Sequence, residues 1–166
     1  RRASDVRLLL QIGRRELGDS TSSYFWSLAK EKHQPGTRIR ILRASEESPF
    51  LSEPRARLRG TPVERWHEDL RRLRSEISFL RDVYHIQVEE RLHAEPYLWR
   101  IFIFDDVAYV SAYLHPRDND SKTVVYKVQD GDNSLFNVFS KYFDYLWKKY
   151  DPCYGGDPVQ HWASWE

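Results

Sequence analysis

The segment from residue 98 to residue 113 places charged and hydroxyl side chains around two apolar stretches. Arg100 stands near the start of the first stretch, and Asp105 and Asp106 separate the first stretch from the second. A guanidinium is a planar fork of donors that suits phosphate or carboxylate, so Arg100 is a candidate for holding an anion. The alternative is a structural role, in which Arg100 pairs with Asp105 or Asp106 beside the turn.

Several common catalytic motifs are missing from the sequence. Gly13 follows an apolar run without the further glycines of a dinucleotide loop, and there is no GxxxxGK[ST] phosphate loop. The six histidines show no HExxH or other metal-ligand spacing, and there is no GxSxG motif. Cys153 lies in a segment rich in Pro and Gly without an activating pattern. We therefore expect no catalytic residue of these types, no metal site and no cofactor.

Length and composition favour one domain of 1–151, followed by a Pro/Gly/Trp tail over 152–166. The chain has 166 residues, of which 40% are hydrophobic and 14% aromatic, which suffices for a core and excludes a disordered chain. The single Cys excludes an intramolecular disulfide framework and fits a reducing, cytoplasmic compartment. No apolar run approaches the ~20 residues of a membrane span, so no membrane partner is expected. Since the sequence has no Met, we expect a processed chain or a fragment of a larger protein.

The net charge of +1 conceals an asymmetry. Residues 1–82 carry 18 Lys and Arg against 12 Asp and Glu, whereas residues 83–166 carry 8 against 13. The isoelectric point of about 8.0 disfavours a duplex-binding role for the Arg-rich half, because duplex-binding domains usually exceed ~9.

Hydrophobic periodicity predicts the elements that position these residues. Runs of alternating or β-branched and aromatic residues predict strands over 5–13, 37–43, 86–91, 99–104, 107–114 and 123–128. The expected hairpin turn is Asp105-Asp106, and a long loop is expected over 44–60. This order predicts an α/β fold in which helices flank a mixed β-sheet.

Three helices are expected between these strands. Residues 24–29 predict the first, and a second begins at Thr61-Pro62-Val63-Glu64, which has the pattern of a capping box. The third begins near Asn133 or Ser134. The inner stripe of the second helix is expected to be Val63, Trp66, Leu70, Leu73, Ile77 and Leu80. That of the third is expected to be Leu135, Val138, Phe139, Tyr142, Leu146 and Trp147, widened by Phe136 and Phe143.

The hairpin segment resembles the phospholipase D-like superfamily, whose enzymes carry HxKx4D on a strand, followed by a second apolar strand and a motif near GSxN. Here HxKx4D is replaced by Leu98-x-Arg100-x4-Asp105. The second motif corresponds to Ser111-Ala112-Tyr113 or, one residue later, to Ala112-Tyr113. The resemblance covers most of residues 5–150 and implies a degenerate phospholipase D-like fold.

The resemblance implies binding rather than catalysis. Leu98 stands where the family has its nucleophilic His, and a Leu side chain has no lone pair to attack phosphorus. Arg100 replaces the family's Lys and keeps the positive charge. The implied site binds a phosphorylated or otherwise anionic small molecule, and its implied ligand-binding residues are Arg100, Asp105, Arg43, Ser45, Ser111 and Tyr113.

The resemblance also implies a context and leaves two other functions open. Degenerate domains of this kind are appended to bacterial regulators, so we expect a homodimer with a fused or neighbouring effector or DNA-binding domain. One alternative is a phosphodiesterase or nuclease that uses His93 or His115. The other is a protein-interaction or dimerisation module that uses the Arg-rich first half and the tail with Trp162 and Trp165.

Overall fold

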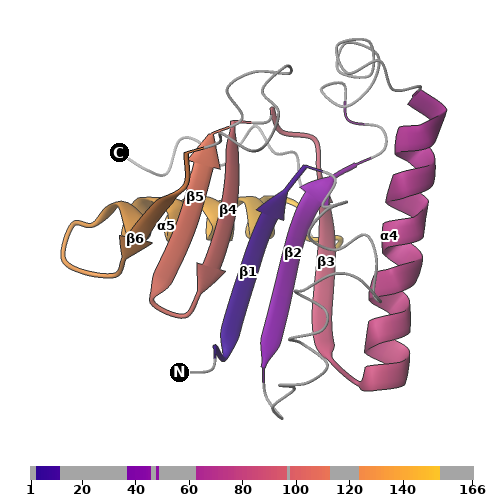
Figure 1. Cartoon of the computed structure of the whole chain (residues 1–166), viewed down its shortest axis with the longest axis horizontal. Coiled ribbons are helices and arrows are strands. Elements are labelled where there is room, and N and C mark those ends of the chain that lie inside the picture. Colours follow the sequence, from indigo (N-terminus) through magenta and orange to yellow (C-terminus); the bar gives the residue numbers. More distant parts are fainter. Residues whose placement is uncertain are drawn as a thin grey trace.

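The structure of the protein is a computed structural model that describes residues 3–11, 37–45, 48, 63–96, 98–112 and 124–153. The helices and strands in these ranges are β1 (Asp5–Leu10), β2 (Arg38–Ala44), α4 (Val63–Tyr84), β3 (Gln87–His93), β4 (Trp99–Phe104), β5 (Val107–Ala112), β6 (Tyr126–Gln129) and α5 (Leu135–Lys149) (Figure 1). The helix expected over 24–29, most of the loop expected over 44–60 and the tail from residue 154 lie outside the described ranges.

The six strands in these ranges form one sheet in the order β3-β2-β1-β4-β5-β6. β1, β2 and β3 are parallel, whereas β4, β5 and β6 each pair antiparallel with their neighbours. The chain turns at Asp105-Asp106 between β4 and β5, as expected. The prediction of an α/β fold with a mixed sheet and flanking helices is therefore confirmed.

Alternation along the strands sends side chains into two separate cores. Leu8 and Leu10 of β1 pack with Leu73 and Ile77 of α4. Leu9 points to the other face of the sheet and packs with residues of α5. Figure 1 shows α5 crossing behind the sheet from the side of β6 toward the side of β3. The two described helices thus pack against opposite faces, α4 on the β3 side of its face, and the two faces bury different sets of strand residues.

The expected inner stripes of the two helices are correct in part. In α4, Leu70 is buried with Leu73 and Ile77, and the other three side chains of the stripe lie outside the described part of the structure. In α5, Leu135 and Val138 were expected inside but are 62% and 58% exposed. The reason is that α5 buries a face that includes Phe136, Phe143 and Trp147. At 3.6 residues per turn, Val138 lies on nearly the opposite side of the helix from Phe136, and Leu135 lies at the margin of the buried face.

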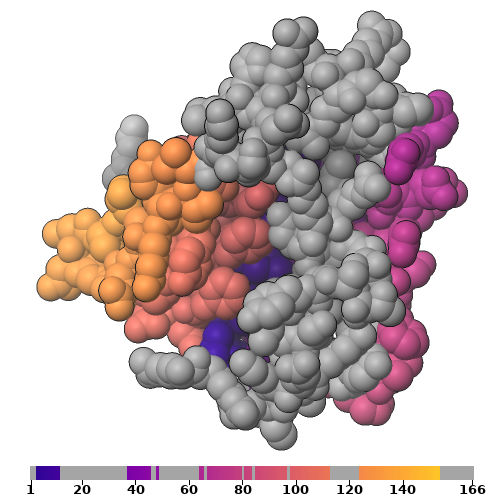
Figure 2. Space-filling model, viewed as in Figure 1, coloured from indigo at the N-terminus to yellow at the C-terminus, as the bar shows by residue number. Residues whose placement is uncertain are grey.

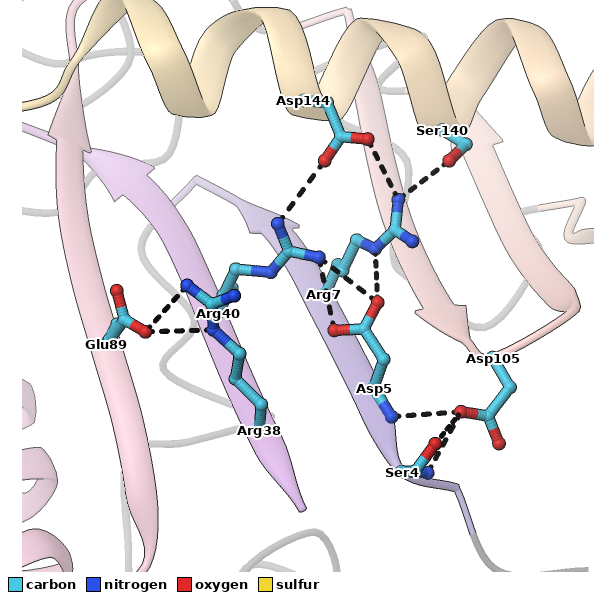
Figure 3. A network of polar contacts seen from close by, with 9 residues as sticks. All are labelled: Ser4, Asp5, Arg7, Arg38, Arg40, Glu89, Asp105, Ser140 and Asp144. Carbon is cyan, nitrogen blue, oxygen red and sulfur yellow. Dashed lines mark hydrogen bonds and ion pairs between the residues drawn. The ribbon is translucent and has the colours of Figure 1, made fainter. Parts of the chain in front are cut away.

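A network of charged side chains joins β1 and β2 to α5 (Figure 3). Arg7 donates through Nη1 to Ser140 Oγ and through Nε to Asp5 Oδ2, both at 2.7 Å. Arg40 donates through Nη2 to the two oxygens of Asp5 at 3.1 Å and through Nη1 to Asp144 Oδ1 at 3.4 Å. Two positive and two negative groups therefore balance each other under the helix and position it on the sheet.

Candidate functional site

Buried polar residues gather at one edge of the sheet. Among the described residues, the buried polar or charged ones are Gln11, Arg43, Ser48, His93 and Ser111. All five lie near the carboxyl end of a strand or just after it: β1, β2 and β3, which are parallel, and β5, which runs in the same direction. Burial of polar groups costs free energy unless they find partners, and ligands of open α/β sheets bind outside the carboxyl ends of the strands. This edge, at the carboxyl ends of β1, β2, β3 and β5, is called the carboxyl edge and is the candidate functional site.

Three of the residues predicted from the sequence lie in one row across this edge. Arg43 on β2 pairs with Leu10 on β1, and Arg100 on β4 pairs with Ser111 on β5. The last pair of the β1–β4 ladder is Leu9 and Ile101. Continuing the antiparallel register by one residue places Leu10 opposite Arg100. Because Leu10 packs in the α4 core, the side chains of this row point to the α4 face. Two strand spacings put the Cα atoms of Arg43 and Arg100 roughly 10 Å apart.

Arg43 is the most deeply buried charged residue of the row, with no exposed surface. Its Nε forms an ion pair with Glu90 Oε1 of β3, and its Nη1 donates to the Ala44 carbonyl at 3.5 Å. Its Nη2 has no hydrogen-bond partner among the described residues, and the same holds for the buried hydroxyl of Ser48. A buried donor without an acceptor costs roughly 1–3 kcal/mol. An acceptor that entered this edge would recover that free energy.

Asp105 lies at the opposite end of β4 from Arg100. Five residues of extended strand separate the two, which is roughly 17 Å. The Asp105 carboxylate accepts hydrogen bonds from the Ser4 backbone N, the Ser4 hydroxyl and the Asp5 backbone N, each at 2.9 Å (Figure 3). It thus fixes the start of β1 and has no part in the row of Arg43 and Arg100. The same separation rules out the expected alternative, a direct ion pair of Arg100 with Asp105 or Asp106.

The remaining predicted residues have varied positions. Ser45 follows β2 at the same edge, and its backbone N donates to the His93 carbonyl at 2.8 Å. Leu98 precedes β4 and is 61% exposed. Tyr113 lies outside the described ranges, so its expected role has no structural counterpart here.

His93 is buried at this edge but lies on the other face of the sheet. It follows Leu92, which pairs with Arg43, and it pairs with Ala44. Its Nδ1 accepts a hydrogen bond from the Glu95 backbone N at 3.2 Å. Burial lowers the pKa of His93 to about 4, and the backbone carbonyl of Leu10 and the Glu95 carboxylate oppose this effect only in part. The ring is therefore neutral at pH 7, and it adds no positive charge to the site.

A second cluster ties the end of β3 to the end of α5. Glu95 Oε1 accepts hydrogen bonds from Lys149 Nζ at 2.6 Å and from the Tyr150 hydroxyl at 2.9 Å. Burial acts to raise the pKa of Glu95, but these two hydrogen bonds outweigh it and the pKa is lowered. Arg91 pairs with Asp151 at 3.0 Å nearby. The cluster closes the α5 side of the edge.

Sequence reasoning did not find several of these residues. Gln11, Glu90 and Ser48 were not singled out. The available signal was a polar residue next to a buried strand, as at Gln11 after the apolar run of β1. That signal becomes specific only when the strand order shows which ends share an edge.

Comparisons of the chain with protein-family models, with curated proteins and with solved structures find no match. In the described ranges, no group of three or more His, Cys, Asp or Glu side chains is placed to hold a metal ion. No helix in those ranges is both long enough and apolar enough to cross a membrane.

Proposed function

We propose that the chain is a degenerate phospholipase D-like module that binds a phosphorylated or otherwise anionic small molecule without transforming it. The observation that carries this proposal is the buried guanidinium of Arg43, whose Nη2 has no acceptor among the described residues. Arg100 lies in the same row, two strands away. An anion at the carboxyl edge would receive donors from both sides.

The hydroxyl groups of the edge complete the proposed site. Ser111 is buried beside Arg100 in the ladder, and Ser48 has a buried hydroxyl without a partner in the described part of the chain. Ser45 lies between β2 and Ser48 in the sequence. Hydroxyl and guanidinium donors together suit the several acceptor oxygens of a phosphate group. Asp105 is left out of this site because of its distance from Arg100.

Binding is favoured over catalysis by the positions of the candidate nucleophiles. Leu98 offers no lone pair at the position of the family's histidine. His93, the candidate of the phosphodiesterase alternative, points to the α5 face, whereas Arg43 and Arg100 point to the α4 face. The other candidate, His115, lies outside the described ranges. We therefore assign the module a regulatory role, in which ligand binding in the cytoplasm of a bacterium is transmitted to a fused or neighbouring effector domain.

Isothermal titration against inorganic phosphate, nucleotides and phosphosugars tests the proposal. We expect at least one of these anions to bind, and we expect Arg100→Gln to weaken binding about tenfold or more, because a hydrogen bond to a charged group contributes ~1.5–3 kcal/mol. Arg43→Lys keeps the charge beside Glu90 but removes the Nη2 donor, so it should weaken the same ligand.

Arg38→Gln is the matched control, because Arg38 is an exposed arginine at the other end of β2 and pairs with Glu89 at 2.9 Å. Its binding should equal that of the wild type. The proposal is wrong if no anion of the panel binds, or if Arg100→Gln binds as tightly as Arg38→Gln does.

A further inference from the structure

β6 forms an edge of the sheet that exposes apolar side chains. One side of β6 pairs with β5, and no strand in the described ranges lies on its other side. Val124, Val125 and Tyr126, at and just before the start of this strand, are each more than half exposed. Exposed apolar edge strands are templates for pairing with another chain, and proteins usually protect them with charge, proline or a covering element.

The first turn of α5 extends this apolar surface. Leu135 and Val138 are exposed, and α5 contacts both β5 and β6. In Figure 2 the orange residues, which belong to β6 and the segment that leads into α5, form one end of the molecule. The apolar edge and the apolar turn therefore lie at the same end, away from the α4 side of the sheet.

The hydrogen bonds between β5 and β6 determine which backbone groups are available at this edge. Asp130 donates its backbone N–H to the Asp106 carbonyl. Along an antiparallel pair, every second residue forms backbone hydrogen bonds with the partner strand, and the backbone groups of the residues between point away from it. Tyr126 and Val128 therefore bond to β5. The N–H and C=O groups of Val125 and Lys127 point to the open edge.

We propose that the open edge binds a second copy of this chain, with β6 of each copy pairing antiparallel about a two-fold axis at Tyr126. In a symmetric antiparallel pair, one residue lies on the two-fold axis, opposite the same residue of the other copy. The alternation of hydrogen bonds allows this central residue to be Tyr126, Lys127 or Val128. Centring on Lys127 places two ammonium groups directly opposite each other, which destabilises a pair. Centring on Val128 places Tyr126 opposite Asp130 and leaves Val124 and Val125 outside the ladder.

Centring on Tyr126 places the apolar side chains of one face opposite one another, and on the other face it places Val125 opposite Lys127. Val124 then lies opposite Val128 of the other copy, and the two Tyr126 rings meet at the axis. Tyr126 pairs with Val110, a core residue under α5, so this apolar stripe faces the α5 side and extends the α5 core across the interface. The stripe is its own complement, which is the property that a two-fold interface requires and that selects a second copy over an unrelated protein.

The oligomeric state tests the proposal directly. We expect the wild type to be a dimer in analytical ultracentrifugation, with a dissociation constant that rises at least tenfold in Val124→Asp, because the new carboxylate lies opposite Val128 of the other copy. Val83→Asp is the matched control, because Val83 on α4 is 53% exposed and Val124 is 60% exposed. A wild type that stays monomeric at every concentration, or a Val83→Asp variant that dissociates as Val124→Asp does, would overturn the proposal.

Disulfide trapping tests the register. With the exposed Cys153 replaced by Ser, Tyr126→Cys should form a covalent dimer on mild oxidation, because directly opposed residues have Cβ atoms ~4.5–5.5 Å apart. Lys127→Cys should not, since its side chain points to the other face and is offset from its copy. More cross-linking at position 127 than at 126 contradicts the register. Neither variant changes Arg43 or Arg100, so anion binding should be retained, and failure here is distinct from failure of the proposed function.

Discussion

Mild acid should destabilise the protein through His93. The ring is buried at the carboxyl edge, its Nδ1 accepts a hydrogen bond, and its pKa is lowered to about 4 from the ordinary value of 6.5, chiefly by burial. The groups that face it are the Glu95 carboxylate, the Leu10 carbonyl and the Tyr150 ring, whose centroid lies 6.2 Å away. Between pH 6.5 and pH 4 the unfolded chain binds a proton at this histidine and the folded chain does not.

The sign and size of the effect follow from this difference. A lowered folded-state pKa contributes stability that is fully present above the unfolded pKa of 6.5 and is lost as the pH falls toward 4. Since one pKa unit corresponds to ~1.4 kcal/mol, the free energy of unfolding should fall by about 2 kcal/mol between pH 8 and pH 5 and by about 3 kcal/mol at full protonation. A domain of this size has only ~5–15 kcal/mol in total.

Urea denaturation at pH 8, 7, 6 and 5 measures this dependence. His93→Asn keeps an acceptor near the position of Nδ1 but does not titrate, so the difference between wild type and variant isolates the histidine from the carboxylates that both proteins share. His85→Asn makes the same change at an exposed position whose φ of 53° suits asparagine. If the difference between wild type and His93→Asn changes by less than ~0.5 kcal/mol from pH 8 to pH 5, His93 is not the buried neutral group that the structure indicates.

Two further predictions concern the supporting contacts. Asp105→Ala should lower the free energy of unfolding by about 1–2 kcal/mol, because three hydrogen bonds are lost. Asp105→Asn is the control, since it keeps an acceptor and tolerates the φ of 49°. Anion binding in titration calorimetry should be equal in both variants, and a loss of binding would show that Asp105 belongs to the site. Asp5→Asn should lower the midpoint of thermal unfolding more than Asp144→Asn does. Asp5 accepts from Arg7 at 2.7 Å and from Arg40 at 3.1 Å, whereas Asp144 accepts from the same two arginines at 3.3 and 3.4 Å. The reverse order would contradict this explanation.

Local patterns in the sequence were sufficient to predict most of the fold. Two runs of apolar, aromatic and β-branched residues over 99–104 and 107–114, on either side of two acidic residues, predict the hairpin. The structure has its strands at Trp99–Phe104 and Val107–Ala112. The failure at Leu135 and Val138 concerns which side of the helix is buried. Apolar residues cover much of the circumference of α5, and the buried side is the one with Phe136 and Phe143. Which side faces the sheet depends on how the helix lies across the strands, and a local pattern does not state that.

The candidate site was harder to predict, because it depends on the strand order. Arg100 and Asp105 are five residues apart in a motif, which suggested a common site, but extended backbone places them at opposite ends of β4. Gln11 and Arg43 are far apart in sequence and lie at one edge because β1 and β2 are parallel neighbours. A sequence pattern does not state which strands are neighbours, and so it could not bring these residues together.

The ion pair of Arg43 and Glu90 is better explained by function than by stability. Removing two charges from water often costs more than their attraction returns, and apolar pairs of similar volume are commonly as stable or more so. Here the arginine has no exposed surface, and its Nη2 lacks a partner in the described ranges, so this pair leaves part of its cost unrecovered. An anion that binds the free nitrogen would recover part of that cost, and Glu90 would hold the guanidinium in place before the anion arrives. A buried charge with one satisfied and one open side, at the edge where α/β sheets bind ligands, is thus the arrangement that anion binding requires.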